Sequence, residues 1–129
     1  MKADRHKRSA VREERLKSSA VSCNIGVSAL SVWRGKSGKR YVVHVTSIDE
    51  TDLVAARGAV VIAICRGAGG CADIIARRAC DPGDGGFLGW LAACATRGAN
   101  ELHTHRLAAT QEQRRIIVED LTDLPSGIA

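Results

Sequence analysis

The chain has 129 residues and a formal net charge of +5, and 45% of its residues are hydrophobic while only 3% are aromatic. A chain of this length forms one domain. No apolar run approaches the ~18 residues that a membrane-spanning helix needs, and no apolar segment of a secretory signal follows the basic start. The five cysteines form no Cys-x-x-Cys pair of the kind that binds zinc. We therefore expect a cytoplasmic protein with reduced cysteines and no membrane partner.

Positive charge is concentrated at the start of the chain. Residues 1–40 hold eleven Lys or Arg and three acidic residues, whereas the remainder holds eight Arg and eleven acidic residues. Only a thin apolar stripe runs through residues 1–20, which favours a disordered or partly helical segment. We therefore divide the chain into a basic N-terminal extension, residues 1–34, and an α/β domain, residues 35–129.

A basic extension can contact the phosphates of a nucleic acid, although a solvated tail without a ligand explains the same charges. Aromatic residues, on which bases stack in single-strand binders, are few. An unknown protein is the alternative partner, and the oligomeric state stays open. The candidate phosphate contacts are Lys2, Arg5, Lys7, Arg8, Arg12, Arg15, Lys17, Arg77 and Arg78.

Residues 35–39, Gly-Lys-Ser-Gly-Lys, share the Gly-Lys-Ser ending of a phosphate-binding loop. Leu30 stands where that motif requires its earlier glycine, and no buried strand precedes the segment. We interpret residues 35–39 as a polar turn. It leads into a strand over residues 41–48, in which Tyr41, Val43 and Val45 share one face.

The apolar run of residues 58–65 predicts the centre of the sheet. An unbroken run rich in Val and Ile is typical of a strand that is buried on both faces. Gly67, Gly69 and Gly70 permit a tight reversal. Residues 72–76 are then the returning strand of a hairpin.

Two helices are expected after this hairpin. Apolar residues recur at helical spacing from Phe87, with Asp84 as the N-cap and Arg97-Gly98 as the end. Residues 101–107 alternate as a strand does. Thr110 and Gln113 then form a capping box for a helix with Ile116, Ile117, Leu121 and Leu124 on its apolar face. The predicted fold is α+β: a small, mostly antiparallel sheet of three to four strands, flanked by two helices.

This order of elements resembles the GIY-YIG nuclease domain. The likeness is greatest to a bacterial and phage branch of that family, in which a Gly-x-Ser-Gly-Lys turn and a Tyr-led strand precede the nuclease motif. The resemblance covers residues 35 to about 125 by pattern rather than by strong identity. The matching segments are residues 35–39, 41–48, 58–62, 72–76, 97–100, 105 and 119–121.

The resemblance does not extend to the catalytic residues of the family. Val61 stands at the Tyr of the first motif, Ile74 and Ala76 at the Tyr and Gly of the second, and Val118 at the metal-binding Glu. The helix at residue 87 opens without the family's Arg. Cleavage of a phosphodiester needs a positioned nucleophile and charge neutralisation at the phosphate. We therefore expect a GIY-YIG-like scaffold that binds nucleic acid or protein without catalysis and without a cofactor.

Two alternatives stay open. The chain could be an active nuclease that depends on Mg²⁺ and uses the displaced residues Glu119, His105 and Arg77. It could also be a structural or oligomerising protein with no ligand. An effect of Glu119→Ala on cleavage of DNA separates the first alternative from the non-catalytic hypothesis.

Other residues suggest weaker candidate sites. His103 and His105 share a strand face, and His44 from a neighbouring strand would complete a zinc set. The same spacing fits half-buried residues at the rim of a sheet, which is the interpretation that we favour. Cys65 and Cys71 flank the hairpin turn and could form a redox bridge, although core packing explains them in a reducing compartment. The pairs Arg77-Arg78 and Arg114-Arg115 suggest a basic surface or a solvated face.

Overall fold

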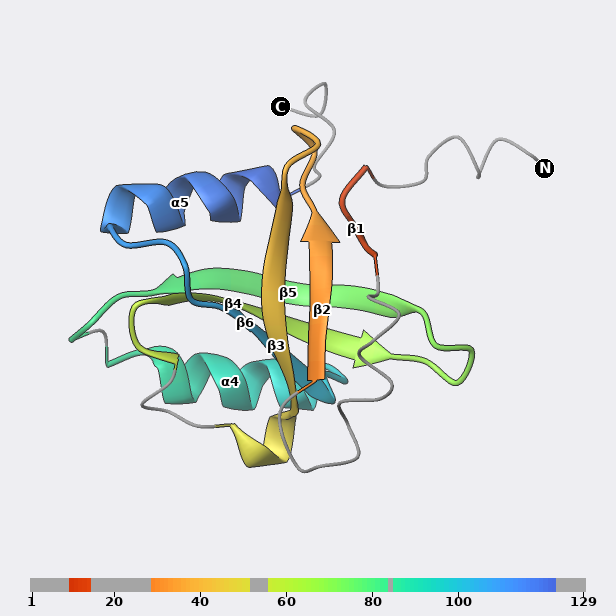
Figure 1. Ribbon diagram of the computed structural model, residues 1–129. Helices are drawn as coiled ribbons and strands as arrows, with labels where there is room; N and C mark the ends of the chain where they lie inside the picture. The colour runs from red at the N-terminus through yellow and green to blue at the C-terminus, as the bar shows by residue number, and fades with distance from the viewer. Residues whose placement is uncertain (1–9, 15–28, 52–55, 84, 123–129) are drawn as a thin grey trace, which may run out of the picture.

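The computed structural model describes residues 10–14, 29–51, 56–83 and 85–122. Within these ranges the chain forms one curled antiparallel sheet with two α-helices (Figure 1). The six strands lie in the order β1-β2-β3-β6-β4-β5. Their bounds are β1 Arg12–Glu13, β2 Ala29–Arg34, β3 Arg40–Ser47, β4 Ala59–Arg66, β5 Ala72–Cys80 and β6 Glu101–His105, and the helices are α4 Phe87–Thr96 and α5 Gln111–Asp120.

The expected sheet of three to four strands is wrong, because the described residues form six. The two additional strands, β1 and β2, come from the segment that the sequence assigned to the N-terminal extension. β2 pairs with β3 over its whole length, from Ala29 opposite Val45 to Arg34 opposite Arg40. Residues 12–13 are a strand rather than part of a helix, and Val11 beside them is buried in the main core. As a strand, this segment forms its backbone hydrogen bonds with β2. As a helix with only a narrow apolar stripe, it would have had to form them within itself, with little packing to stabilise it.

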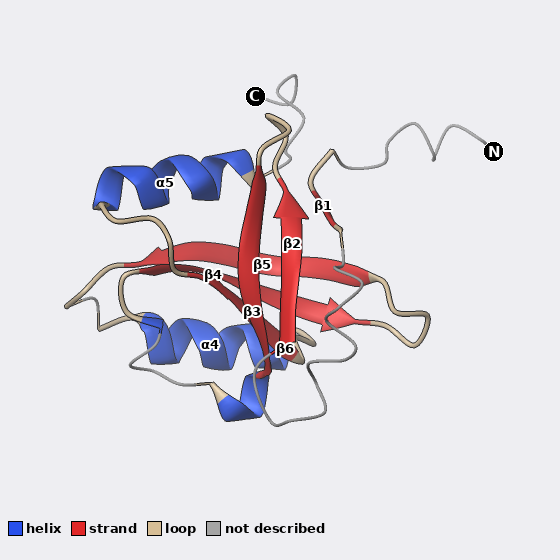
Figure 2. Cartoon of the chain, viewed as in Figure 1, coloured by secondary structure: helices blue, strands red, loops and turns tan. Residues whose placement is uncertain are grey.

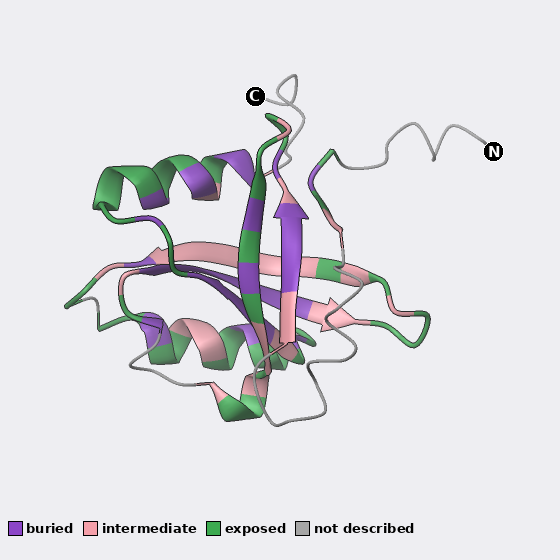
Figure 3. Ribbon diagram, viewed as in Figure 1, coloured by how far each residue is buried: buried purple, intermediate pink, exposed green. Residues whose placement is uncertain are grey.

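β4 is buried on both faces, as the sequence predicts, but it lies next to the edge strand of the sheet rather than at its centre. It lies between β6 and β5, and residues 59–64 are completely buried. Figure 3 shows burial along most of β4, whereas buried and exposed residues alternate on β3. A strand that is covered on both faces must be apolar on both faces, which is why the run contains no polar residue.

Each helix covers one face of the sheet (Figure 2). Ile117 of α5 and its C-cap residue Leu121 pack on the face that carries Trp33, Val43 and Ile62. Phe87 and Cys94 of α4 pack on the opposite face, where Val61, Ala63 and Leu102 lie. The side chains of β4 therefore belong to two separate cores, divided by the sheet.

A bulge in β5 changes which side chains face each helix. The register of β4 and β5 shifts between Ala63 and Ile64, so that Ala63 pairs with Ala76 and Ile64 pairs with Ile74. Ile75 is the additional residue, and it packs with Ala76 on the α4 side. Ile74 packs on the α5 side. Without the bulge, residues 74 and 76 would share a face.

The local signals for the ends of the helices are mostly confirmed. Thr110 and Gln113 form the predicted capping box of α5, and Gly98 follows α4 with a φ of 107°. Gly86 rather than Asp84 is the N-cap of α4. Asp84 and Leu124 lie outside the described residues. Ile117 and Leu121 are buried as expected, but Ile116 is exposed.

Candidate nucleic-acid interface

The turn between β2 and β3 is wrapped around the carboxylate of Asp120, at the end of α5. The backbone N–H and the hydroxyl of Ser37 donate to Oδ1 and Oδ2 of Asp120 at 2.8 and 2.7 Å. The Tyr41 hydroxyl donates to the same Oδ2 at 2.7 Å. The backbone N–H of Lys36 donates to the Asp120 carbonyl at 2.9 Å. Residues 35–39 are therefore a turn, and an internal carboxylate occupies the place that a phosphate would take in a phosphate-binding loop.

The environment of Asp120 favours its charged form. Burial works to raise the pKa of Asp120, but the hydrogen bonds from Tyr41 and Ser37 outweigh it, so the pKa is lowered. Burial and the bond to this carboxylate raise the pKa of Tyr41 to about 12. Each bond involves one charged group, which makes it stronger than a neutral hydrogen bond. The β2–β3 turn is thus held against α5, and with it the backbone positions of its two lysines.

A basic patch surrounds this turn. Three arginines converge on the single carboxylate of Glu14: Arg40 at 2.6 Å, Arg12 at 3.6 Å and Arg34 at 3.7 Å. Arg34 and Arg40 are opposite each other in the β2–β3 register. Lys36 and Lys39 lie in the turn between them and are exposed. We call Arg12, Arg34, Lys36, Lys39 and Arg40 the turn patch.

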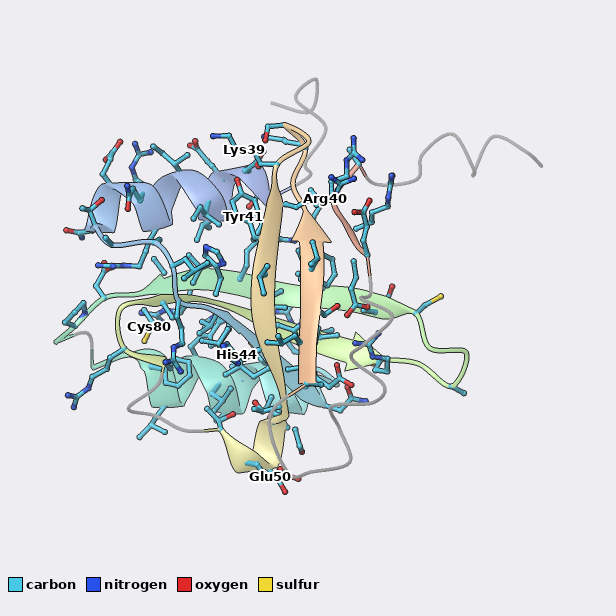
Figure 4. All side chains as sticks on the ribbon, in the orientation of Figure 1. Lys39, Arg40, Tyr41, His44, Glu50 and Cys80 are labelled. Atoms are coloured by element: carbon cyan, nitrogen blue, oxygen red, sulfur yellow. The ribbon has the colours of Figure 1, made fainter. Side chains whose placement is uncertain are left out.

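A groove runs along α5 on one side of the turn patch. A cleft of about 300 Å³ is lined by Lys39, Tyr41, His105, Leu107, Ala108, Gln113, Ile116 and Ile117. A second cleft of about 210 Å³ shares Lys39, Tyr41 and Ile116 with the first and continues to Lys36 and Glu119. Figure 4 shows Lys39 and Tyr41 on the side of β3 that faces α5, and Arg40 on the side of β1. The turn patch therefore extends from the outer face of the sheet to the groove.

The three histidines do not form the zinc set that the sequence left as a weaker alternative, and His103 and His105 are buried rather than half-buried at a rim. His103 and His105 are buried on the α5 side of the sheet, where His103 contacts Trp33 and His105 contacts Tyr41. His44 is exposed and alternates to the other face of β3 from Tyr41 and Val43. Among the described residues, no three His, Cys, Asp or Glu side chains are grouped so that they could hold a metal ion.

His103 belongs to a buried polar cluster that sequence reasoning missed. The indole N–H of Trp33 donates to Nδ1 of His103 at 2.9 Å, so Nδ1 carries no proton. Nε2 of His103 lies 2.9 Å from Oε1 of Glu101 and donates to it. The same Oε1 accepts from Nη2 of Arg66 at 2.9 Å. The histidine is thus neutral and has both ring nitrogens bonded.

Arg66 joins this cluster to β1. Its Nη1 and Nη2 donate to the two oxygens of Glu13 at 2.7 and 3.0 Å, its Nε donates to Glu101 at 3.2 Å, and Nη1 also donates to the Gly70 carbonyl at 2.9 Å. With the bond from Nη2 to Glu101, all five guanidinium donors are used. Ser31 donates to Glu13 at 2.8 Å. These bonds attach the short strand β1 to the far end of β4 and stabilise the curl of the sheet.

The residues that the sequence resemblance aligned with catalytic positions of the GIY-YIG family are part of the two cores. Val61 is fully buried beside Phe87, and Ala76 is on the same face of the sheet. Ile74 and Val118 pack on the opposite face, against the core under α5. Glu119 is 72% exposed and lies 3.9 Å from Arg115. The four positions are therefore divided between the two faces, and Glu119 points away from the core.

The predicted basic residues are placed very differently from one another. Arg12 is part of the turn patch, and Arg78 lies over Trp90 with 6.0 Å between its Cζ and the ring centroid. Arg77 pairs with Ile62 at the edge strand β5. Arg114 is buried and bonded to Asp81 at 2.8 Å, so it belongs neither to a basic surface nor to a solvated face. The remaining candidates, Lys2, Arg5, Lys7, Arg8, Arg15 and Lys17, lie outside the described residues.

Sequence reasoning missed Arg34, Lys36, Lys39 and Arg40 as candidate contacts. The signal was present in part, because a predicted tight turn places the residues on either side of it opposite each other. Arg12 and Glu14 are far from this turn in the sequence. Strand pairing brings them beside Arg34 and Arg40, and no pattern of neighbouring residues indicates this. Cys65 and Cys71 form no disulfide bridge, and the core packing that the sequence favoured for them is not found either, because Cys65 is only partly buried opposite Asp73 and Cys71 is exposed.

Comparison with models of protein families, with curated protein sequences and with solved structures found no match. The assignment of a function therefore depends on the geometry and charge of the described surface. Neither α4 nor α5, nor any other helix in the described ranges, has the length and apolar character to cross a membrane.

Proposed function

We propose that the protein is a non-catalytic nucleic-acid-binding module on a GIY-YIG-like scaffold, and that the turn patch is its main contact with phosphate. The observation that carries the proposal is the excess of cations at Glu14. One carboxylate is shared by Arg12, Arg34 and Arg40, and Lys36 and Lys39 add two exposed charges beside them. Arginines that are only partly neutralised within the protein attract a polyanion.

The attachment of the turn supports the same proposal. Asp120 holds the turn through Ser37 and Tyr41, so the flanking Lys36 and Lys39 do not have to order a flexible loop when they bind. Ordering a side chain or loop on binding costs free energy, and a preorganised contact avoids part of this cost. A rigid basic turn is suited to the backbone of a duplex, whose phosphates are regularly spaced.

The aromatic residues favour a duplex over a single strand. Trp33, Tyr41 and Phe87 are buried. Trp90 is half-buried, stacked on Phe87 with 5.9 Å between ring centroids. All four aromatic residues of the chain are thus engaged in the cores, and none offers the exposed face on which single-stranded bases stack. Binding through phosphates alone implies low sequence specificity.

The alternative of an active nuclease receives no specific support. The three residues that it would use are in different surroundings. Glu119 is exposed and paired with Arg115, His105 is buried in the groove, and Arg77 lies on the edge strand. A divalent metal would need several oxygen or nitrogen ligands around one point. We therefore propose binding rather than cleavage.

The test is the affinity for a fluorescein-labelled DNA duplex, measured by anisotropy in full-length protein between about 50 and 200 mM salt. The first variant is Lys36→Gln/Lys39→Gln/Arg40→Gln. The control, Arg97→Gln/Arg106→Gln/Arg115→Gln, removes the same charge from exposed positions outside the turn patch. The slope of the logarithm of the binding constant against the logarithm of the salt concentration reports how many phosphates are neutralised. We expect the first variant to reduce this slope by about 2 to 3, because it loses three cations that each neutralise one phosphate in the native chain. The control should change the slope little.

A third variant, Lys2→Gln/Arg5→Gln/Lys7→Gln, separates the turn patch from the basic start of the chain. An equal loss of affinity in the patch variant and the control would mean that only total charge matters and would contradict the proposal. So would a loss of affinity that is confined to the third variant, or an absence of duplex binding by the native chain.

A further inference from the structure

His105 lines the groove beside α5. Only 5% of the residue is exposed, and its Nδ1 lies 2.8 Å from the Val42 carbonyl. A carbonyl only accepts, so Nδ1 must carry a proton. Within the described part of the chain Nε2 has no hydrogen-bond partner, and His105 is one of the residues that line the cleft. The imidazole is therefore fixed by the sheet, with Nε2 left for a ligand.

The walls of this cleft are apolar on the α5 side and at its mouth. Leu107 is 77% exposed and Ile116 is 47% exposed. They are two of the four large hydrophobic residues that are exposed in the described part of the chain. Both line the same cleft, together with Ala108 and Ile117. Two exposed aliphatic side chains at the mouth of one cleft are suited to a flat apolar group between them.

The polar groups of the cleft lie around these walls. Gln113 accepts the backbone N–H groups of Ala109 and Thr110 with its Oε1, so its amide NH₂ remains for a ligand. The Tyr41 hydroxyl is engaged by Asp120. Lys39 is exposed at the junction of the two clefts, and its ammonium can neutralise an anion there.

We infer that this groove is a subsite for one unpaired nucleotide, with its base between Leu107 and Ile116 and its phosphate at Lys39. The inference rests on the proposed function, because it assumes that the turn patch brings a nucleic acid to this end of the molecule. The edge of the base meets Nε2 of His105. The cleft of about 300 Å³ is at the lower end of the range for small-molecule sites, which limits the occupant to a single nucleotide.

The second cleft limits the number of phosphates. It continues from Lys39 to Lys36 and is closed by Glu119 and Asp120. Two carboxylates at this end oppose further negative charge. The subsite should therefore prefer a nucleoside monophosphate to a triphosphate.

The test uses adenosine 5′-monophosphate as the probe and records backbone amide and histidine ring NMR signals of the full chain. We expect saturable shifts at His105, Lys39 and Ile116 at millimolar nucleotide, and smaller shifts with adenosine triphosphate. Leu107→Asp, at an exposed position, should weaken binding at least ~10-fold. Leu88→Asp is the matched control, because Leu88 is 60% exposed on the other face of the molecule and should leave binding unchanged.

Three results would overturn the inference: no shifts with adenosine 5′-monophosphate, the same shifts with ribose 5-phosphate, or equally weakened binding in Leu107→Asp and Leu88→Asp. Each is distinguishable from failure of the proposed function. Blunt duplex binding depends on the turn patch and should survive Leu107→Asp. Nucleotide shifts without any duplex binding would support the subsite and contradict the proposed function. Duplex binding without nucleotide shifts would support the proposed function and contradict the subsite.

Discussion

Gly35 leaves room for the carboxylate of Asp120, which lies against its backbone. A Cβ atom at residue 35 would overlap Oδ2 of Asp120, and the Asp120 side chain cannot move aside without losing its bonds to Ser37 and Tyr41. The contact joins residues that are 85 positions apart in the chain. It fixes the β2–β3 turn, and with it Lys36 and Lys39, against the end of α5.

Gly35→Ala should therefore destabilise the fold by about 1–3 kcal/mol, the usual cost of an added methyl group in a packed site. Denaturant unfolding measures the change. Gly89→Ala is the control, because a Cβ at Gly89 meets no atom within 4 Å and the residue lies inside α4. The control should be neutral or stabilising by up to ~1 kcal/mol through helix propensity. Equal effects of the two substitutions would contradict this account.

Removal of the Arg66 guanidinium should be more damaging. Arg66→Met leaves Glu13 and Glu101 without their main cation, and their side chains are only 7% and 23% exposed. Breaking a buried ion pair from one side costs about 3–5 kcal/mol. Arg97→Met, at an exposed position after α4, should change the free energy of unfolding by less than about 0.5 kcal/mol.

A triple variant, Arg66→Met/Glu13→Gln/Glu101→Gln, should recover part of the lost stability, because no uncompensated charge is then left. If Arg66→Met were as stable as Arg97→Met, the cluster would not be holding β1 in place. Urea unfolding of all three variants at one pH makes the comparison.

The acid stability of the protein should depend on Glu101. The pKa of Glu101 is lowered to about 2, because its hydrogen bond with His103 and its bonds with Arg66 outweigh its desolvation. This lies below the value of about 4.3 in an unfolded chain. The stabilisation from the Glu101 charge is therefore complete above about pH 4.3 and is lost as the pH falls towards 2.

Glu101→Gln should consequently be less stable than the native chain at pH 7, and the difference should shrink below about pH 4.3. Unfolding by urea at several pH values measures the difference. Glu112→Gln is the control, because the Glu112 side chain is 66% exposed and pairs only with Arg115 at the surface. A deficit of Glu101→Gln that stays constant down to pH 2 would show that its charge is not the source.

Glu119→Ala tests the catalytic alternative. We expect no cleavage of supercoiled plasmid with Mg²⁺, and no change in duplex affinity when this residue is removed, because Glu119 is 72% exposed and its nearest cation is 3.9 Å away. Gel analysis of the plasmid and anisotropy of the duplex provide the two measurements. Mg²⁺-dependent nicking that disappears in Glu119→Ala would establish a nuclease and overturn the non-catalytic proposal.

Residues close together in the chain carried the predictions that succeeded. The hairpin of β4 and β5, the helix α4 and the capping box of α5 each follow from a pattern of a few neighbouring residues. Hydrophobic periodicity and turn chemistry are local properties, and they agree with the fold at these places. The burial of β4 on both faces was visible in the same way, because no polar residue interrupts it.

The places where sequence reasoning failed involve pairing between distant residues. The place of β2 in the sheet is decided by its register with β3. Arg114 looks like a surface cation in the sequence, but Asp81 and the carbonyls of Gly58 and Ala108 accept its bonds in the interior. The faces of the histidines depended on strand register, and the bulge at Ile75 places Ile74 and Ala76 on opposite faces, where a regular strand would place them on the same face.

The sequence by itself determined the hairpin of β4 and β5 and the two helices, because these depend on residue type and local spacing. Only the tertiary structure decided the candidate site. Strand pairing brings Arg12, Glu14, Arg34 and Arg40 together, and the bond of Asp120 to Ser37 holds the turn that carries the two lysines. Such contacts join segments that are far apart in the chain, and no fixed spacing in the sequence indicates them. They exist only once the sheet has formed.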